Sequence, residues 1–429
     1  MISIQEALDK REGKVKLHGW VYRERKSKQI VFIVLRDSSN IVQCIVKKDI
    51  VSEAEWNIAE KILIESAVEI EGEIKEDSRA PTGFEVNVKK LNLISMAEPF
   101  PINKDQSTEF LADNRHLWLR SRKMTAIMKV RSTIFGAIHG FFRGKGFYEY
   151  QSPMFQSIQC EGGSTLFKLN YFGSEVFLAQ TWQLYAEPAI FALEKIYTLA
   201  PSFRAEKSKT SRHLTEYWHA EMEVAWEGFL ELQDYAEDLI KFVFKKVLEV
   251  NKEELKILER DVSKLEPVIK KPFVRMTYTE ALDILKKKNK MDVKWGKDLR
   301  TVEEDELVKN YDVPLIVTCY PKEVKAFYMK ENPDNPKTVL GFDLLAPEGY
   351  GEIIGASERE VDLEKLKSKL EAEGEDLENY GFYLDTRKYG SVQHAGFGMG
   401  VERLISWICG LDNIKDAIAF PRTPLRYKP

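Results

Sequence analysis

Long apolar runs are absent from this sequence of 429 residues. A membrane-spanning helix needs roughly 18 or more consecutive apolar residues, and no such stretch occurs. The first residues, MISIQEALDKREGKVKL, also lack the apolar core of a signal peptide. We therefore expect a cytoplasmic protein that does not contact a membrane.

Cysteine is scarce. The four cysteines are far apart, and no two of them form a C-x-x-C pair; they are Cys44, Cys160, Cys319 and Cys409. This spacing argues against a structural zinc site and against a disulfide framework. It favours small buried side chains in a reducing compartment.

An excess of positive charge is also missing, because the net charge is −4 at pH 7. Proteins that coat nucleic acid non-specifically gain most of their affinity by neutralising phosphates, so the composition argues against that class. An enzyme with a local basic groove remains compatible with it. One basic run fits either such a groove or a solvated hairpin; it contains Arg23, Arg25, Lys26 and Lys28.

Residues from about 14 to 95 show the pattern of a small β-barrel. Alternating and β-branched runs predict five strands, and residues 54–63 predict one short helix between them. A closed barrel of the oligonucleotide-binding (OB) kind has this composition. We assign this OB-fold domain to residues 1–97.

The rest of the chain predicts a linker and a larger domain. Residues 98–113 are polar and contain two prolines, as is typical of a linker. Residues 114–429 alternate between helical and strand patterns in mixed order. This order predicts an α+β domain with a largely antiparallel sheet flanked by helices.

Two charged side chains in the segment IYTLAPSFRAE are candidates for nucleotide binding. Arg204 and Glu206 are two residues apart on a predicted strand, so both should face one side. A guanidinium holds a phosphate or carboxylate through paired hydrogen bonds, and a carboxylate can accept from an adenine amino group. The loop that follows is basic, with Lys207, Lys209, Arg212 and His213. The next predicted strand presents Glu221 and Glu223 on one face.

A glycine-rich segment, GFGMGVERL, lies near the C-terminus. Gly396, Gly398 and Gly400 would let the backbone approach a ligand, and Arg403 falls just inside a predicted helix. The segment lacks the Lys-Ser/Thr pair of a P-loop and does not open a βαβ unit. A Rossmann-type site is therefore excluded.

Taken together, these segments resemble the signature motifs of class II aminoacyl-tRNA synthetases. The matching features are Pro153 after a long helix, the FRAE segment and the GxGxER segment. Within the predicted barrel, FIVLRDSSNIVQ resembles the anticodon-binding domain of the aspartyl, asparaginyl and lysyl subgroup. The resemblance covers nearly the whole chain. It implies a ligase that forms an aminoacyl-adenylate from ATP and transfers the amino acid to tRNA.

The resemblance also implies which residues bind ATP. Arg204 would clamp the α-phosphate and the amino-acid carboxylate, and Arg403 would hold the γ-phosphate; these two are the expected catalytic residues. Asp343 and Glu352 look like the acids that hold Mg²⁺ in this subgroup, although their separation is two residues longer than in aspartyl relatives. The full ATP set is Arg204, Glu206, Arg212, His213, Tyr217, Glu352, Gly400 and Arg403.

Asparagine is the amino acid that the sequence favours. Aspartyl enzymes carry a lysine where the segment QTWQLYAE has Ala186, and without it an aspartate side chain would lack its charge partner. Glu221 would accept from the substrate amide and Arg359 would donate to it. The expected amino-acid set is Glu161, Gln183, Ala186, Arg204, Glu221, Ser357 and Arg359, with Gln183 on the ammonium group and Glu161 in a loop that closes over the substrate.

In the barrel, the resemblance places Phe32 and Gln43 where the subgroup stacks on and reads the middle anticodon base, with Arg23 beside them. It also implies a homodimer built on the long helix and the region of Pro153. The function expected is that of an asparaginyl-tRNA synthetase, most like the archaeal ones, acting on tRNA(Asn), L-asparagine and ATP.

Three alternatives remain open from the sequence. An aspartyl-tRNA synthetase, including one that charges both tRNAs, is disfavoured by Ala186 and Glu221. A paralogue that makes free asparagine without tRNA would lack the barrel that carries Phe32 and Gln43. A non-catalytic relative would not need the arginines and acids of the ATP set.

Overall fold

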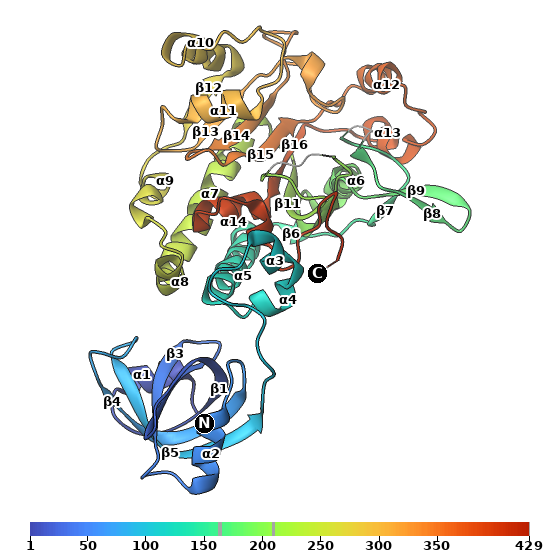
Figure 1. Cartoon of the computed structure of the whole chain (residues 1–429). Helices are drawn as coiled ribbons and strands as arrows, with labels where there is room; N and C mark the ends of the chain where they lie inside the picture. The colour runs from blue at the N-terminus through green and yellow to red at the C-terminus, as the bar shows by residue number, and fades with distance from the viewer. Residues whose placement is uncertain (162–164, 208–210, 429) are drawn as a thin grey trace. The chain divides into compact units, whose positions relative to one another are not determined.

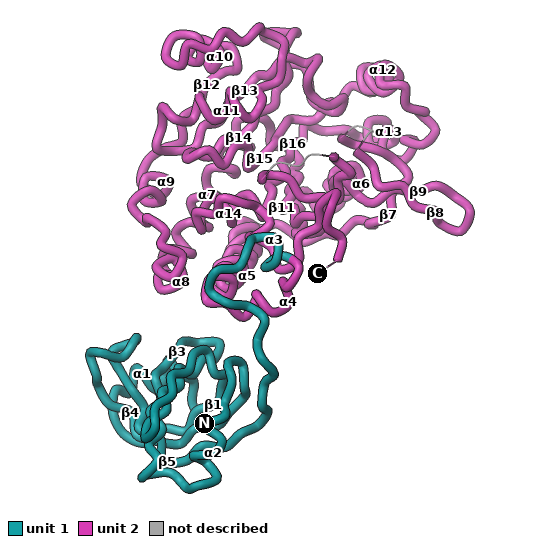
Figure 2. Tube along the Cα trace, viewed as in Figure 1, with its two compact units in different colours: residues 1–112 teal, residues 113–429 magenta. Residues whose placement is uncertain are grey.

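The computed structural model describes residues 1–161, 165–207 and 211–428 (Figure 1). Lys209, part of the predicted basic loop, lies outside these residues. The chain divides into two compact units, residues 1–112 and 113–429 (Figure 2), and each is described by itself. No helix in the described parts of the chain is both long and apolar enough to cross a bilayer.

The first unit is a closed barrel, which confirms the predicted OB-fold. Its strands are β1 (Gly13–Lys26), β2 (Ile30–Arg36), β3 (Ile41–Lys47), β4 (Ala67–Glu76) and β5 (Phe84–Ser95), in the order β1-β2-β3-β5-β4. Alternation drives this fold: Val31, Ile33 and Leu35 of β2 are fully buried, while the residues between them lie on the outer face. The predicted short helix is α2 (Glu53–Lys61), and α1 (Ile4–Lys10), which begins with a Ser3–Glu6 capping box, was not predicted.

The second unit is built on one large mixed sheet. Its order is β12-β13-β14-β15-β16-β11-β10-β6, and only the two outermost pairings are parallel. The predicted antiparallel character is therefore confirmed. The strands are β6 (Tyr148–Glu149), β10 (Lys195–Phe203), β11 (Glu216–Ala225), β12 (Val274–Thr277), β13 (Leu315–Thr318), β14 (Gly341–Ala346), β15 (Gly351–Glu358) and β16 (His394–Gly400).

Three helices form the main core with one face of this sheet. They are α5 (Arg122–Gly144), α7 (Phe229–Val250) and α14 (Val401–Cys409), and their buried apolar side chains form one cluster with those of the strands. The other helices are α3 (Thr108–Asp113), α4 (Arg115–Trp118), α6 (Gln183–Leu193), α8 (Lys252–Ile257), α9 (Glu266–Lys270), α10 (Tyr278–Lys288), α11 (Thr301–Val308), α12 (Leu363–Ala372) and α13 (Gly381–Lys388).

Helix α6 covers the opposite face of β10 and β11. Tyr197 and Met222 belong to the main core, whereas Ile196 and Ala225 pack against α6 in a separate cluster. Neighbouring residues of a strand point to opposite faces, so the two clusters lie on the two sides of the sheet. The functional site is built on the α6 side.

The structure corrects one sequence-based prediction. β10 ends at Phe203, so Arg204 and Glu206 follow the strand rather than lying on it. The sequence also leaves strand partners open: β9 (Ser174–Leu178) pairs with β7 (Phe155–Gln156) and β8 (Lys168–Tyr171) in a separate sheet, because a tight turn at Phe172 and Gly173 joins β8 directly to β9. Residues 251–313 form four α-helices and a strand.

Candidate active site

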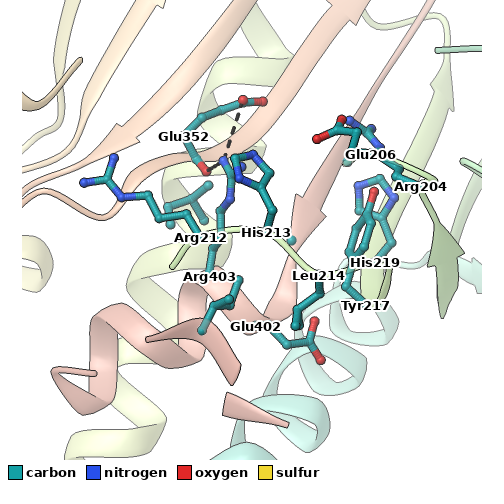
Figure 3. Close-up of a pocket in the computed structure, with 14 residues that line it drawn as sticks. Arg204, Glu206, Arg212, His213, Leu214, Tyr217, His219, Glu352, Glu402 and Arg403 are labelled. Atoms are coloured by element: carbon teal, nitrogen blue, oxygen red, sulfur yellow. Dashed lines mark hydrogen bonds and ion pairs between the residues drawn. The ribbon is translucent and has the colours of Figure 1, made fainter. Parts of the chain in front are cut away.

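A pocket of about 230 Å³ lies beside β11, β15 and β16 at the start of α14. Figure 3 shows Arg204, Glu206 and Tyr217 on one side of it and Arg212, Arg403 and Glu352 on the other. All eight residues predicted to bind ATP line this pocket: Arg204, Glu206, Arg212, His213, Tyr217, Glu352, Gly400 and Arg403. The fold thus brings together side chains that are up to 199 residues apart in the sequence, 403 minus 204.

Arg204 is a half-buried cation whose Nε atom has no hydrogen-bond partner among the described residues. Its backbone N–H donates to the carbonyl of Thr215 (2.9 Å), which ties the two limbs of the β10–β11 connection together. Its Nε is buried and donates to no group among the described residues. The neighbouring Tyr217 raises the pKa of the guanidinium against the effect of burial, and Glu161 and Glu352 add to this. A buried, charged donor without a partner suits an anionic ligand.

The other two arginines are oriented by acids of the same unit. Nη1 of Arg403 donates to the backbone carbonyl of Glu352 and lies 3.8 Å from its carboxylate. Nη2 of Arg212 donates to both carboxylate oxygens of Asp305 on α11 (2.9 and 2.8 Å). Burial and the charge of Arg403 lower the pKa of His213. The pocket therefore presents fixed positive charge, as a polyphosphate requires.

The two acids expected to hold magnesium converge on one point. Asp343 on β14 pairs in register with Gly355 on β15, and a Cβ built at Gly355 would lie 4.0 Å from Oδ1 of Asp343 and 3.0 Å from Oε1 of Glu352. Burial raises the pKa of Asp343 to about 6, with Glu352 contributing, although Lys325 donates to the other oxygen (2.7 Å). Burial also acts on Glu352, but Arg403 and Lys325 outweigh it and lower its pKa.

Glu221 lies against the first turn of α6. Its carboxylate accepts from the hydroxyl of Thr181 and from the backbone N–H of Trp182 (3.0 Å), and it lies 3.4 Å from Nδ1 of His219. Burial works against ionisation, but His219 and these donors lower the pKa of Glu221. Glu221 is therefore a buried carboxylate at the α6 end of the site.

Arg359 pairs with Glu223, not with Glu221. Its Nε donates to Oε1 of Glu223 (3.1 Å), its Nη2 also donates to this carboxylate, and its Nη1 donates to Oγ of Ser357 (2.8 Å). Burial raises the pKa of Glu223 to about 7 against the pull of Arg359. Arg359 is 136 residues away from Glu223 in the sequence, so the identity of this partner emerges only from the fold.

The other residues of the predicted amino-acid set lie on or near α6. Nε2 of Gln183 donates to Oε1 of Glu187 (2.9 Å), and Ala186 is fully buried in the apolar cluster under the helix. Glu161 accepts from the hydroxyl of Tyr328 (2.8 Å), and Tyr328 in turn lies under Arg359, whose Cζ is 5.1 Å from the ring centroid. The set therefore surrounds one region next to the ATP pocket.

The glycines of β16 leave space for side chains of β11. A Cβ at Gly396 would overlap the carboxylate of Glu223, and a Cβ at Gly398 would overlap the ring of His219. These two glycines therefore make room for the protein's own groups, and Gly398 also lines the pocket. At Gly400 the nearest atom is a side-chain carbon of Arg403 at 3.9 Å, and that position borders the pocket.

Sequence reasoning missed several buried charges. Glu187 and Arg387 are completely buried and paired, His394 joins them, and Lys325 and Asp305 hold Asp343 and Arg212. No local motif surrounds these residues, and their partners are 18 to 207 positions away. Only the tertiary contacts, and not the local sequence, identify these residues as partners.

On the barrel, the predicted anticodon residues share one outer face. Phe32 pairs with Arg25 across β1–β2, Arg23 pairs with Val34, and Val34 pairs with Gln43 across β2–β3, so the side chains of these pairs project to the same side. Phe32 is half-buried and is absent from the apolar core of the barrel. Phe32 is therefore not a core residue of the barrel.

Both units match families of known proteins. Residues 107–424 match the model of the class II tRNA synthetases for aspartate, lysine and asparagine (D, K and N), and residues 15–94 match that of the OB-fold nucleic acid binding domain. This chain belongs to the class II aminoacyl-tRNA synthetases.

Similar members of this synthetase family align from end to end. The asparagine–tRNA ligase of Thermoplasma acidophilum is 48% identical over 431 residues, covering 100% of both chains, and that of Thermococcus kodakarensis is 50% identical over 97% of each. The crystal structure of asparaginyl-tRNA synthetase from Pyrococcus horikoshii complexed with asparaginyl-adenylate superimposes with a TM-score of 0.96, at 46% identity, and covers 100% of this chain and 99% of that one.

Proposed function

We propose that this synthetase is an asparagine–tRNA ligase, which activates L-asparagine with ATP and transfers it to the 3′ end of tRNA(Asn). The observation that carries the proposal is that, among the described residues, the side-chain end of the site presents no free cation: Ala186 is buried among apolar groups, and Arg359 already has a carboxylate partner. An amide fits such a site, whereas a carboxylate would bring an uncompensated charge. The full-length similarity to asparagine–tRNA ligases supports the same substrate.

Activation is a displacement at phosphorus. A carboxylate oxygen of asparagine attacks the α-phosphorus of ATP, the bond from that phosphorus to the β-bridging oxygen breaks, and pyrophosphate leaves. Arg204 donates to the α-phosphate and the amino-acid carboxylate, and its unpaired buried Nε provides for this contact. Its fixed charge stabilises the negative charge that grows on the phosphate oxygens.

The remaining ATP contacts follow from the placement of the side chains. Glu206 accepts from the adenine amino group, and the ring of Tyr217 lies against the base. Arg403, next to Gly400, and Arg212 with His213 neutralise the outer phosphates and then the departing pyrophosphate. Because the acids Asp305 and Glu352 contact Arg212 and Arg403, little orientational freedom is lost when the phosphates bind.

The acids Asp343 and Glu352 fit a magnesium ion. Their oxygens converge over Gly355, and among the described residues no third acid, histidine or cysteine completes a metal-ligand cluster with them. Magnesium is commonly held by one or two carboxylates, with phosphate oxygens and water completing its shell. When bound, Mg²⁺ would neutralise phosphate charge.

The amino-acid contacts complete the active site. Arg359, with Ser357 behind it, donates to the amide oxygen of asparagine, and Glu221 accepts from the amide nitrogen. Gln183 accepts from the substrate ammonium group, and Glu161 lies at the closing loop. In the second step the terminal hydroxyl of tRNA attacks the adenylate carbonyl and AMP leaves.

The barrel would select the tRNA. Phe32 stacks on the middle anticodon base, Gln43 reads its edge, and Arg23 holds the backbone. On this proposal residues 1–97 form the anticodon domain, 98–113 the hinge and 114–429 the catalytic domain. The enzyme works in the cytoplasm as a homodimer built on α5 and the region of Pro153.

ATP–pyrophosphate exchange with asparagine and aspartate in parallel, without tRNA, tests the proposal. Strong exchange with asparagine and little with aspartate is expected, followed by asparagine transfer only when tRNA(Asn) is added. Preference for aspartate would identify an aspartyl enzyme, and tRNA-independent release of free asparagine would identify the paralogue. Arg204→Met should abolish exchange, whereas Arg275→Met, at a partly exposed arginine that contacts Asp234 and lies outside the pocket, should not.

A further inference from the structure

Behind the amino-acid site lies a buried group of charges that the mechanism above does not use. Glu187 on α6 is completely buried, as is the side chain of Arg387 on α13, and His394 at the start of β16 contacts the same carboxylate. Arg359 lies 4.0 Å from Glu187 on its other side. One carboxylate therefore lies within 4.0 Å of two arginines and a histidine.

Every contact of Glu187 is with a donor. Oε2 accepts from Nη2 of Arg387 (2.6 Å) and lies 3.1 Å from Nε2 of His394. Oε1 accepts from Nε2 of Gln183 (2.9 Å) and from the hydroxyl of Tyr383 (3.1 Å). Despite burial, Arg387 and His394 lower the pKa of Glu187, so the group is a carboxylate in the folded protein.

Both ring nitrogens of His394 face acceptors. Nδ1 lies 2.8 Å from the backbone carbonyl of Val392, and Nε2 lies 3.1 Å from Oε2 of Glu187. The permanent positive charges beside Glu187 are those of Arg387 and Arg359, and Arg359 also pairs with Glu223.

Glu187 also connects two residues of the amino-acid site. Gln183, proposed to bind the ammonium group, donates to one of its oxygens, and Arg359, proposed to bind the side chain, is within ion-pair distance of the same oxygen. Low-polarity surroundings leave charges poorly screened, so the field of this cluster reaches the adjacent substrate side chain.

We infer that Glu187 is a specificity-determining residue, whose negative charge, together with that of Glu223, offsets the arginines Arg359 and Arg387 so that the site does not attract the carboxylate of aspartate. This inference rests on the proposed function. Without the charge of Glu187, the positive potential at the side-chain end rises and favours an anionic substrate. Glu187 acts through other residues and is therefore a positioning residue.

Glu187→Gln tests this inference with little change of shape. The glutamine oxygen can replace Oε2 toward Arg387 and His394, and its amide nitrogen can face Gln183 and Tyr383, because the amide of Gln183 can flip and the tyrosine hydroxyl can accept. The readout is the inhibition constant of aspartate against asparagine-driven exchange, divided by the KM for asparagine. We expect this ratio to fall about tenfold or more in E187Q.

Two further variants test the same inference, so that the result does not depend on E187Q alone. Arg387→Gln removes a positive charge and should raise the ratio, and the double variant E187Q/R387Q should return it to within about threefold of the original value, because the charges are again balanced. The control is Asp416→Asn, which removes the acid beside the buried Arg115 (3.2 Å) and should lower stability without changing the ratio.

The possible outcomes distinguish failure of the inference about Glu187 from failure of the proposed function. If the unaltered enzyme shows no exchange with asparagine, the proposed function fails. If it does, but E187Q and R387Q lower activity while the ratio stays constant, Glu187 is only structural and the inference is wrong. If E187Q does not fold, R387Q alone decides: an unchanged ratio overturns the inference and a raised ratio supports it.

Discussion

At the scale of single residues, the choice of amino acid depends on buried charged side chains and on the uncharged residue at position 186. Ala186 packs against Ile196 and Ala225, and Ala225 projects from the same face of β11 as Glu223. The position of Ala186 therefore lies beside the carboxylates of the substrate side. A cation at this position would add positive charge to the substrate side of the site, whose existing cationic side chains are already paired with carboxylates.

Ala186→Lys is expected to shift preference toward aspartate. The added ammonium group would pair with an aspartate carboxylate, so the ratio of kcat/KM for aspartate to that for asparagine should rise about tenfold or more. Ala186→Met is the matched control, since it adds comparable length without charge. Equal ratios in the two variants would show that bulk, not charge, matters at this position.

The acid Glu304 on α11 is expected to make stability depend on pH. Burial, followed by the charges of Glu352 and Asp343, raises its pKa to about 8 from 4.5. Between these values the folded protein holds a proton that the unfolded chain has lost, so this group costs stability progressively as pH rises from about 4.5 to 8. Replacing it by a neutral group removes that cost.

Glu304→Gln should therefore raise the melting temperature at pH 8.5 and have little effect at pH 5, with a gain on the order of a few kcal/mol. Thermal unfolding at the two pH values measures this. The control is Glu306→Gln on the same helix, where Lys309 lowers the pKa of an exposed acid. An equal effect of E304Q at both pH values would contradict the prediction.

At the scale of elements, β11 and β16 fit together because β16 lacks side chains at two points. Glu223 and His219 of β11 occupy the space that a Cβ would fill at Gly396 and Gly398. His219 also lies 3.3 Å from Oγ of Ser202 and 3.4 Å from Glu221, so it cannot move freely. The strand pairing thus fixes the positions of Glu223 and, through His219, of Glu221.

Gly398→Ala should disturb the site far more than Gly400→Ala. The new Cβ would overlap His219, whereas at Gly400 the nearest atom is 3.9 Å away. We expect the rate of ATP–pyrophosphate exchange to fall by about tenfold or more in the first variant, because displacing a packed group by about 1 Å is costly at an active site, and to fall less than threefold, a rough bound, in the second. Similar losses in both would mean that the glycines serve the ligand instead.

At the scale of the whole molecule, two compact units divide the work. The catalytic unit contains the pocket and the buried charges, and the barrel carries Phe32, Arg23 and Gln43 on one outer face. On the proposed function, amino-acid activation needs only the catalytic unit, whereas tRNA charging needs both units. Substitutions in the barrel should therefore separate the two reactions.

Phe32→Ala should reduce aminoacylation of tRNA(Asn) and leave exchange unchanged. Loss of stacking on one base costs about 1–3 kcal/mol, which corresponds to roughly 5- to 150-fold in kcat/KM for tRNA. Ile94→Ala, at an exposed apolar residue of β5, serves as control. A parallel loss in exchange would show that the variant damages the fold rather than the tRNA contact.

The sequence by itself determined the barrel and the mixed α+β unit, because strand alternation and helix periodicity are local patterns. It also led to residues that line the pocket, because the FRAE and GxGxER segments resemble class II motifs. It did not determine the pairing of β9 with β7 and β8, since the pattern of a strand does not name its partner. It also placed Arg204 on a strand that ends one residue earlier.

Only the tertiary structure decided which buried charges are partners. Arg359 pairs with Glu223, which lies 136 residues away in the sequence, and Glu187 contacts Arg387 and His394, which lie about 200 residues away. A charged residue in a sequence looks the same whether it is solvated or buried. Its role becomes defined only when folding removes water and leaves a neighbouring side chain as its partner.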